Sequence, residues 1–360
     1  MAITDPCTRN SVEVPELSRY RFNRTLAIAV AIASVLEARP TRAEDDGLFC
    51  SATASNLFEA CRSEADDGYF VAKAKCLNVS DPEEQQECRV EATTARKEDY
   101  QSCREQRDGR VDACGSLGEG PYDPDFHPED FDHPQNPTNP NPYFPLTVGH
   151  TWEYVGGTEL NTLEVLNETK LIDGVTCIVV RDQVFNDGDL VEDTDDWYAQ
   201  AKDGNVWYCG EEVKHFESSE GDEPRLPELV SIDGSFKAGR DRDKPGIIFQ
   251  AAPAPGQMYR EEYSLGNAED VTEVLSTSYA FGNDPDGLDQ FVPQALADRM
   301  CSQGDCVVTK NFSLLEPGVL ARKYYAGGIG FFLEVNPDTG EVLQLVDCSF
   351  DDRCKGLPTP

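Results

Sequence analysis

Six cysteines near the N-terminus have a palindromic spacing, and this feature constrains the fold more than any other. They stand at positions 50, 61, 76, 88, 103 and 114, so the intervals are 11, 15, 12, 15 and 11 residues. The position numbers add up to the same value in three pairs, 50 and 114, 61 and 103, and 76 and 88. Residues that face each other in an antiparallel helical hairpin have this relation. Steps of 11 and 15 residues also return to nearly the same side of a helix. The spacing therefore predicts three nested disulfides, Cys50–Cys114, Cys61–Cys103 and Cys76–Cys88.

The composition around these cysteines favours helices. Residues 44–117 are rich in Ala, Glu, Arg and Asp and contain few β-branched residues. Ser80 and Glu83 form a capping-box pattern at the expected turn, with Pro82 in the first turn of the second helix. The segment has no C-x2-C pair and no histidine, so structural disulfides are favoured over a metal site. In a two-helix unit with little core, each disulfide would contribute ~2–4 kcal/mol.

Residues 1–43 are predicted to be an export signal. A basic stretch precedes the apolar residues 26–36, which reach only about half the length of a membrane span. Cleavage after Ala43 or Ala38 would remove Cys7 and leave twelve cysteines, an even number that fits six disulfides in an oxidising compartment. We therefore expect a secreted or periplasmic protein with no membrane span in the mature chain.

The chain is strongly acidic. It has 31 Lys and Arg against 67 Asp and Glu, a net charge of −36, and loss of residues 1–43 would leave 25 against 63. Such a surface repels phosphate backbones and anionic lipid heads, so no nucleic-acid partner is expected. It suits cation binding, although a solvated acidic surface is the commoner reason for such a charge.

A linker rich in Pro, Asp and Asn is expected over residues 118–145. Prolines at this density exclude helices and sheet interiors, so the segment should be extended. Residues of metal-ligating type lie close together in it: Asp123, Asp125, His127, Glu129, Asp130, Asp132 and His133. The favoured interpretation is a solvated linker whose aromatic residues Tyr122, Phe126 and Phe131 dock on the neighbouring domain.

The hydrophobic period changes to two after the linker, and residues 146–354 are predicted to be an antiparallel β domain, followed by a tail over 355–360. The expected strands are 151–155, 160–168, 175–185, 190–200, 205–216, 231–236, 257–265, 271–281, 307–315, 319–326, 330–335 and 341–348. One helix is expected over 293–300. So many strands with short connections predict a meander curled into a barrel, a half-barrel or a sandwich. The aromatic hairpin around Asp203-Gly204 should lie at its middle. The whole fold is thus α+β by segments.

Six cysteines remain in the β domain, and they allow fifteen pairings. Cys177 and Cys209 stand on expected strands close in order, and the other four flank two short loops. The preferred set is therefore Cys177–Cys209, Cys301–Cys306 and Cys348–Cys354.

The β domain resembles a family of uncharacterised exported bacterial proteins. The motifs that carry this resemblance are residues 141–146, 149–152, 196–200, 202–208, 244–247, 259–263, 315–319 and 322–326. The cysteine hairpin is similar to a segment that precedes this domain in some members. The resemblance implies export and these domain boundaries, and it implies no activity.

The sequence predicts no catalytic residue and no organic cofactor. It has no G-x-S-x-G, H-E-x-x-H, P-loop or G-x-G-x-x-G motif in a suitable context, and His127, His133, His150 and His215 pair with no nucleophile in the sequence. Paired carboxylates of a glycoside hydrolase cannot be located among so many acidic residues.

Calcium is the sharpest cofactor prediction. Asp284, Asp286 and Asp289 surround Gly287 in a short oxygen-rich loop of the type that suits Ca²⁺, but the loop lacks the full EF-hand spacing and the distal glutamate. A second acidic cluster spans a turn and the strand after it: Asp187, Asp189, Glu192, Asp193, Asp195 and Asp196. Side chains alternate faces along a strand, so only some of these converge. A plain acidic turn is the alternative for each.

We expect an exported, non-catalytic binding or interaction protein that uses a cavity or an aromatic face of the β domain. The alternatives are an extracytoplasmic hydrolase acting through paired carboxylates and a structural envelope protein. A pocket with two carboxylates at catalytic separation would favour the hydrolase, whereas a pocket lined by apolar groups would favour binding.

Overall fold

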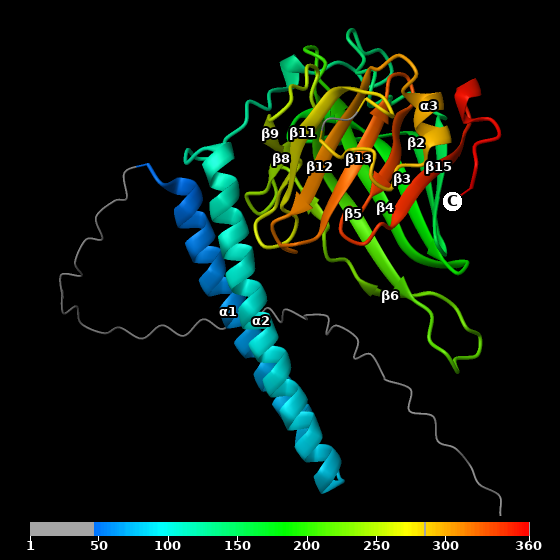
Figure 1. Cartoon of the computed structure of the whole chain (residues 1–360). Helices are drawn as coiled ribbons and strands as arrows, with labels where there is room; N and C mark the ends of the chain where they lie inside the picture. The colour runs from blue at the N-terminus through cyan, green and yellow to red at the C-terminus, as the bar shows by residue number, and fades with distance from the viewer. Residues whose placement is uncertain (1–46, 284–285, 360) are drawn as a thin grey trace, which may run out of the picture. The chain divides into compact units, whose positions relative to one another are not determined.

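The computed structural model describes residues 47–283 and 286–359 (Figure 1). The predicted export signal and Asp284 lie outside these residues. The described chain begins with helix α1, Phe49–Cys76, and helix α2, Pro82–Leu117. The two helices form an antiparallel hairpin joined by Cys50–Cys114, Cys61–Cys103 and Cys76–Cys88, with Cα–Cα distances of 5.8, 5.7 and 5.6 Å. These are the nested pairs expected from the spacing.

The start of α2 differs from the expected capping box. The cap is Asp81, whose carboxylate accepts hydrogen bonds from the backbone N–H of Glu83 at 2.8 Å and of Glu84 at 3.0 Å. Pro82 occupies the first helical position, so the residue directly before it becomes the N-cap, and a carboxylate suits the positive end of the helix. The prediction that Ser80 and Glu83 form the cap was wrong by one residue.

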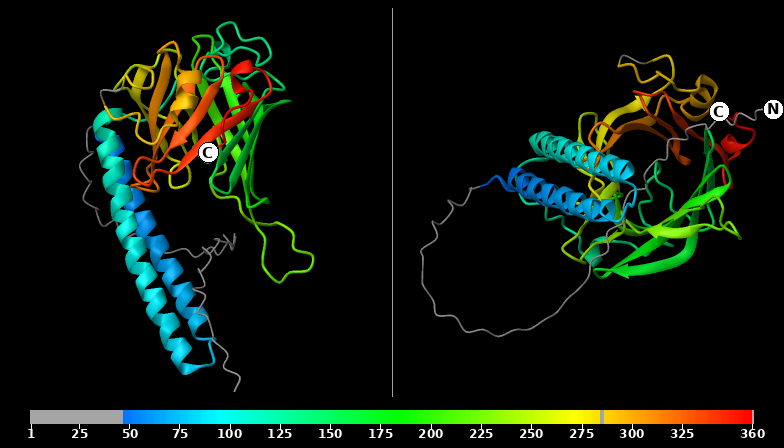
Figure 2. Two further views of the ribbon diagram at one scale, coloured as in Figure 1. Left: turned by 45° about the vertical axis from the view of Figure 1, so that its right-hand side comes forward. Right: turned by 90° about the horizontal axis from the view of Figure 1, so that it is seen from below.

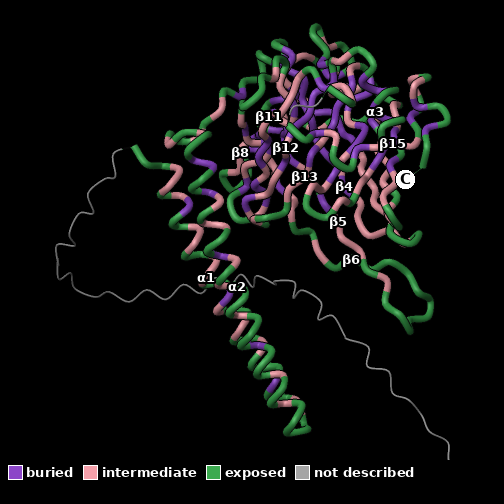
Figure 3. The backbone as a smooth tube through the Cα atoms, in the orientation of Figure 1, coloured by how far each residue is buried: buried purple, intermediate pink, exposed green. Residues whose placement is uncertain are grey.

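The hairpin has almost no core of its own. Its buried residues are mainly alanines and half-cystines, such as Ala54, Ala65 and Ala92, and one end exposes Phe70 and Leu77 by 60% and 67% (Figure 3). The disulfides therefore provide the constraint that apolar packing provides in a thicker bundle.

The linker docks on the β domain through its aromatic residues, as the favoured interpretation predicted. The rings of Phe126 and Phe131 lie 5.6 and 6.2 Å from the ring of Trp207. The ring of Tyr122 lies 4.8 Å from that of Tyr263. A single turn of 3-10 helix, Pro128–Asp130, separates the two docked phenylalanines.

Fifteen strands form one antiparallel sheet (Figure 1). They are β1 Thr151–Gly156, β2 Glu159–Ile172, β3 Val175–Asn186, β4 Asp189–Gln200, β5 Val206–Glu217, β6 Glu228–Ser231, β7 Phe236–Lys237, β8 Lys244–Phe249, β9 Met258–Arg260, β10 Glu262–Tyr263, β11 Asp270–Tyr279, β12 Cys306–Ser313, β13 Leu320–Ala326, β14 Gly330–Val335 and β15 Val342–Cys348. Helix α3, Gln294–Met300, follows β11 as expected, and a short 3-10 turn, Asp352–Cys354, follows β15.

The sheet curls until its two ends nearly meet. The strand order is β10-β8-β5-β4-β3-β2-β1-β15-β14-β13-β12-β11-β9, with β6 and β7 on β5. The segment 258–263 pairs with β11 through β9 and with β8 through β10, so one short segment connects both ends of the order. The result is a nearly closed barrel, which confirms the predicted fold class and distinguishes it from a sandwich (Figure 2).

Three expected features of the sheet were wrong. Residues 232–235 form a turn between β6 and β7 rather than a strand. Strand β8 was missed because Pro245 and Gly246, both poor strand formers, stand at its start. The aromatic hairpin of β4 and β5 lies near one end of the strand order, because β1 and β15 pair and occupy its middle.

Gly246 is required where the barrel ends meet. A Cβ atom at this position would lie 1.9 Å from the carbonyl oxygen of Glu261. We expect Gly246→Ala to lower the free energy of unfolding by about 1–3 kcal/mol, measured by urea denaturation, because β8 must move away from the 258–263 segment. Gly109→Ala in α2 is the matched control, since its added Cβ meets nothing within 4 Å and should stabilise the helix slightly. Equal stability of the Gly246→Ala variant and the wild type would contradict the close approach.

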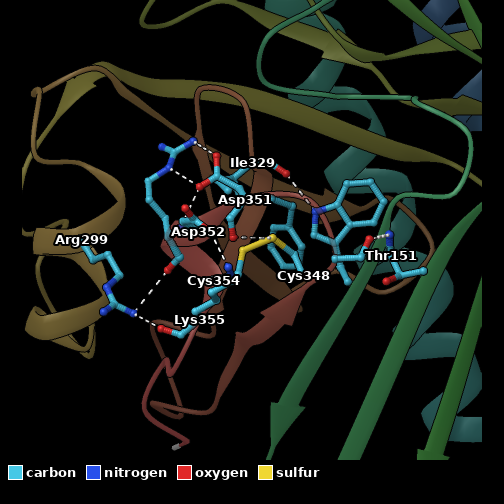
Figure 4. The surroundings of a disulfide bond; sticks show 12 residues. Thr151, Arg299, Ile329, Cys348, Asp351, Asp352, Cys354 and Lys355 are labelled. Carbon is cyan, nitrogen blue, oxygen red and sulfur yellow. Dashed lines mark hydrogen bonds and ion pairs between the residues drawn. A yellow bond between two sulfur atoms is a disulfide. The ribbon is translucent and has the colours of Figure 1, made fainter.

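The three disulfides of the β domain are Cys177–Cys209, Cys301–Cys306 and Cys348–Cys354, as preferred from the sequence. Figure 4 shows the last of them, which closes the segment after β15. Arg299 of α3 donates to the carbonyl oxygen of Lys355 at 2.9 Å and holds this segment. The indole N–H of Trp152 donates to the carbonyl oxygen of Ile329 at 2.9 Å nearby. Among the described residues, no helix has the length and apolarity needed to cross a membrane.

Candidate ligand site in the barrel interior

Alternation along β4 decides which side chains enter the barrel. Trp197 belongs to the outer cluster that contains the docked linker phenylalanines, whereas Tyr198 belongs to the main core. Residues two apart share a face, so Asp196, Thr194 and Glu192 point inward with Tyr198. Asp196 is 7% exposed and Thr194 is 3% exposed, which fits this assignment.

The neighbouring strands place further carboxylates beside Asp196. Glu211 on β5 is the direct cross-strand partner of Asp196, and such partners have Cβ atoms roughly 5 Å apart. Asp182 on β3 pairs with Thr194 and therefore lies diagonally from Asp196. His215 on β5 pairs with Glu192, and its Nδ1 lies 3.5 Å from the Glu192 carboxylate.

The segment that joins the barrel ends adds two more carboxylates, Glu261 and Glu262. Across the barrel, Lys323 on β13 pairs with Glu334 on β14, and its Nζ lies 3.9 Å from the Glu334 carboxylate. Burial works to lower the pKa of Lys323, but the charges of Glu334, Glu261 and Asp270 outweigh burial and the pKa is raised. Lys323 therefore stays protonated in an acidic environment.

The interior is closed at one end and partly accessible towards the other. At the closed end, the linker residues Phe144 and Tyr143 place their rings 5.1 Å from Tyr198 and 5.8 Å from Phe249. Away from this end, the side chains of Lys323 and Glu334 are 32% and 35% exposed, and those of His215 and Glu192 are 38% and 33% exposed. Glu211 and Glu262 are partly buried.

This environment shifts the inward carboxyls towards their protonated forms. Burial raises the pKa of Asp196 to about 7 despite a hydrogen bond from Tyr208, and burial raises the pKa of Glu261 to about 7 as well. Burial and then the charge of Asp196 raise the pKa of Asp182 and of Glu211 well above the usual range. Burial and then the charge of Asp270 do the same to the pKa of Glu262. Shifts of this kind concentrate at functional sites.

The hydrogen bonding of these carboxyls is unequal. Glu261 Oε1 accepts hydrogen bonds from the Thr272 hydroxyl and from Asn311 Nδ2 at 2.7 Å, and Thr309 donates to Asn311 at 2.6 Å. This hydrogen-bond network is buried, so it serves to hold β11 and β12 to the segment 258–263. Asp182 Oδ1 and Asn161 Oδ1 on β2 are buried and accept no hydrogen bond, although the Asn161 side chain acts as a hydrogen-bond partner that works to lower the pKa of Asp182.

Two tyrosines flank the Asp196–Glu211 pair. The rings of Tyr198 and Tyr208 are stacked with centroids 4.9 Å apart, and the Tyr208 hydroxyl donates to Asp196 Oδ1. Burial raises the pKa of both phenols well above the usual range, so both remain neutral donors. The site therefore combines carboxylates, orphan acceptors and aromatic faces.

The predicted calcium loop is only partly described, because Asp284 lies outside the described residues. Both carboxylate oxygens of Asp289 accept hydrogen bonds, from the Tyr279 hydroxyl at 2.8 Å and from the Gly282 N–H at 2.9 Å. Asp289 thus holds the loop in shape. No group of three or more metal-ligating residues occurs in residues 47–283 and 286–359, and calcium at Asp284, Asp286 and Asp289 stays a prediction.

The acidic linker residues have separate partners. Asp123 pairs with Lys244, and Asp132 accepts from the N–H and the hydroxyl of Thr138 at 2.7 and 2.6 Å. His127 lies 3.9 Å from the carboxylate of Asp125, on an exposed surface. These contacts fit the solvated-linker interpretation.

The second acidic cluster divides between the two faces of β4. Asp193 and Asp195 face outward, where Arg181 lies 3.8 and 3.3 Å from their carboxylates. Asp189 pairs with Arg225. Only Glu192 and Asp196 enter the barrel. Other inward carboxyls were missed from the sequence, among them Asp182, Glu211, Glu261 and Glu262.

A groove of about 580 Å³ lies where the linker meets β3 and β4, at the closed end of the barrel. No charged side chain lines it; the lining includes Pro137, Pro142, Phe144, Ile178 and Gln200. His150 has a packing role, because its ring stacks on Phe350 with centroids 3.8 Å apart. Neither feature places a base beside a nucleophile.

The chain matches no family model, no curated protein and no solved structure.

Proposed function

We propose that this is a non-catalytic binding protein that takes up a positively charged ligand inside the β-barrel. The observation that carries the proposal is an imbalance of charge: within the described residues, the inward carboxyls outnumber the inward bases. The carboxyls with raised pKa values are Asp182, Asp196, Glu211, Glu261 and Glu262. The inward bases are Lys323 and His215, which already lie beside two further carboxylates, Glu334 and Glu192.

Buried carboxylates that no positive charge compensates are costly, and they respond either by binding protons or by binding cations. A cation held among them would let the carboxyls ionise and would replace the protons. The six disulfides fit an oxidising compartment, and we place this binding role outside the cytoplasm.

The direct pairing of Asp196 with Glu211 keeps the paired-carboxylate hydrolase as the second candidate. Burial raises the pKa of both carboxyls, and acid–base catalysis uses carboxyls whose pKa values are raised in this way. Turnover of a chromogenic glycoside that is lost in both Asp196→Asn and Glu211→Gln would favour this candidate over binding alone.

The test is a thermal melt slightly above neutral pH with millimolar spermidine, and with NaCl at matched ionic strength as reference. A ligand at a hundred times its Kd stabilises the folded state by ~2.7 kcal/mol, which raises the melting temperature by several degrees. We expect this shift in the wild type and in Asp195→Asn, whose side chain faces outward, and its loss in Asp196→Asn on the same strand. A shift that NaCl reproduces, or that both variants retain, would contradict the proposal. Millimolar Ca²⁺ in the same melts tests the loop at Asp286 and Asp289.

A further inference from the structure

We infer that a small pocket where the helical hairpin and the linker meet the β domain binds a short aliphatic carboxylate. The pocket has a volume of about 40 Å³, and its lining includes Arg110 of α2, Tyr122 of the linker, and Arg260 and Tyr263 of the segment 258–263. None of the inward carboxyls with raised pKa values lines it. The inference goes beyond the cation-binding function proposed above, because the ligand has the opposite charge and a different site.

Arg260 is a cation without an ion-pair partner among the described residues, in a protein rich in carboxylates. Its guanidinium carbon lies 5.1 Å from the ring centre of Tyr263 and 5.6 Å from that of Tyr122, so two aromatic rings hold it in place. Its Nη2 donates to Cys50 Sγ at 3.6 Å, and a sulfur atom is a weak acceptor. Burial lowers the pKa of Arg260, which is the effect expected of a cation that lacks a close negative charge.

Arg110 supplies a second donor that the protein leaves unused. Its Nε and Nη2 each donate to the Glu269 carboxylate at 2.8 Å, but its Nη1 is buried and has no hydrogen-bond partner. The side chain is only 5% exposed, so bulk water does not supply the missing acceptor. The charges of Arg110 and Glu269 cancel, and Arg260 therefore leaves the pocket with one excess positive charge.

These groups favour a small ligand with a single negative charge. The Glu269 carboxylate would repel a dianion, whereas one carboxylate balances the excess charge. Carboxylate oxygens also match the donor geometry of guanidinium groups. A volume of about 40 Å³ exceeds the roughly 10–15 Å³ that one water molecule needs, so a group of a few heavy atoms fits. Phe49, Leu265 and Leu314 also line the pocket, and they provide apolar contacts for a short alkyl chain.

The experiment is titration calorimetry of the purified protein at neutral pH with sodium propionate and with propionamide, which has the same shape and no charge. We expect propionate to bind at least about tenfold more tightly than propionamide, because hydrogen bonds to a charged acceptor are the stronger ones. Arg260→Gln should weaken propionate binding about tenfold or more, and Arg260→Lys, which keeps the charge, should recover part of the affinity. Arg104→Gln is the matched control and should bind as the wild type does, because Arg104 is exposed on α2 and does not line the pocket.

The wild-type titrations decide the inference even if an arginine variant fails to fold. Equal affinity for propionate and propionamide, or no binding of propionate at millimolar concentration, would overturn the carboxylate site. A propionate affinity that Arg260→Gln leaves unchanged would also overturn it. Chloride that displaces propionate at equal concentration would indicate a halide site and would overturn the inference as well. The spermidine melts are independent of all these outcomes, since no inward carboxyl with a raised pKa lines this pocket.

Discussion

The free energy of unfolding should fall as the pH rises from about 4 to about 7. The cause is the set of inward carboxyls. Asp196 and Glu261 have pKa values of about 7 in the folded protein, against usual values of 3.8 and 4.5. Between the usual and the folded values the folded state binds more protons than the unfolded state, so rising pH favours unfolding. Each pKa unit corresponds to about 1.4 kcal/mol, so each carboxyl contributes on the order of 3–4 kcal/mol as an upper limit.

Urea denaturation at several pH values measures this slope. Asp196→Asn and Glu261→Gln remove one titrating group each, so each variant should flatten the pH dependence and gain stability relative to the wild type above neutral pH. Glu273→Gln is the control, because Glu273 faces outward from β11 and lies 3.7 Å from Lys310. Stability that rises between about pH 5 and about pH 7 would contradict the protonated interior.

Arg110→Leu should produce the largest loss of stability of any single substitution considered for the hairpin. Arg110 of α2 and Glu269 form a bidentate ion pair with two hydrogen bonds of 2.8 Å, and they are 5% and 2% exposed. Removing one partner of a buried pair leaves the other charge uncompensated and costs about 3–5 kcal/mol. The nearby apolar cluster of Ala113, Val271 and Leu314 carries no charge, so it cannot compensate the Glu269 carboxylate.

Limited proteolysis of the linker and urea denaturation would both report this loss. The double variant Arg110→Leu/Glu269→Leu should recover much of the stability, because it leaves no buried charge. Arg107→Leu is the matched control on the same helix, since Arg107 pairs with Asp108 on the surface and such pairs contribute about 0–1 kcal/mol. Equal stability of Arg110→Leu and Arg107→Leu would show that the buried pair does not hold the hairpin to the β domain.

The hairpin could be predicted from the sequence because its geometry relates positions by simple arithmetic. Facing residues of two antiparallel helices share an index sum, and Cys50, Cys61 and Cys76 each have a partner at that sum. The cap at Asp81 was missed by one residue because Ser80 also fits a capping pattern and local preferences differ little between the two.

The interior could be predicted only in part because both faces of β4 are buried. Trp197 is buried in the outer cluster and Tyr198 is buried in the main core, at 4% and 9% exposure, so alternation of apolar residues does not reveal which face is internal. Once the internal face of β4 is known, Asp196 and Glu192 can be assigned to the interior and Asp195 to the outer face. Glu261 and Glu262 depend on a segment that pairs with two strands distant in sequence, which no local pattern encodes.

The central claim is that the acidic interior exchanges protons for a cation, and proton-linked calorimetry tests it most directly. Spermidine would be titrated into the protein slightly below neutral pH in two buffers of different ionisation enthalpy. Binding should release protons, because a bound cation lowers the pKa of the inward carboxyls, so the heat should differ between the buffers. The difference should shrink in Glu211→Gln and persist in Glu212→Gln, whose side chain is exposed and lies beside Lys214. Heats that are equal in both buffers, or a release that Glu211→Gln leaves unchanged, would contradict a cation site built from these carboxyls.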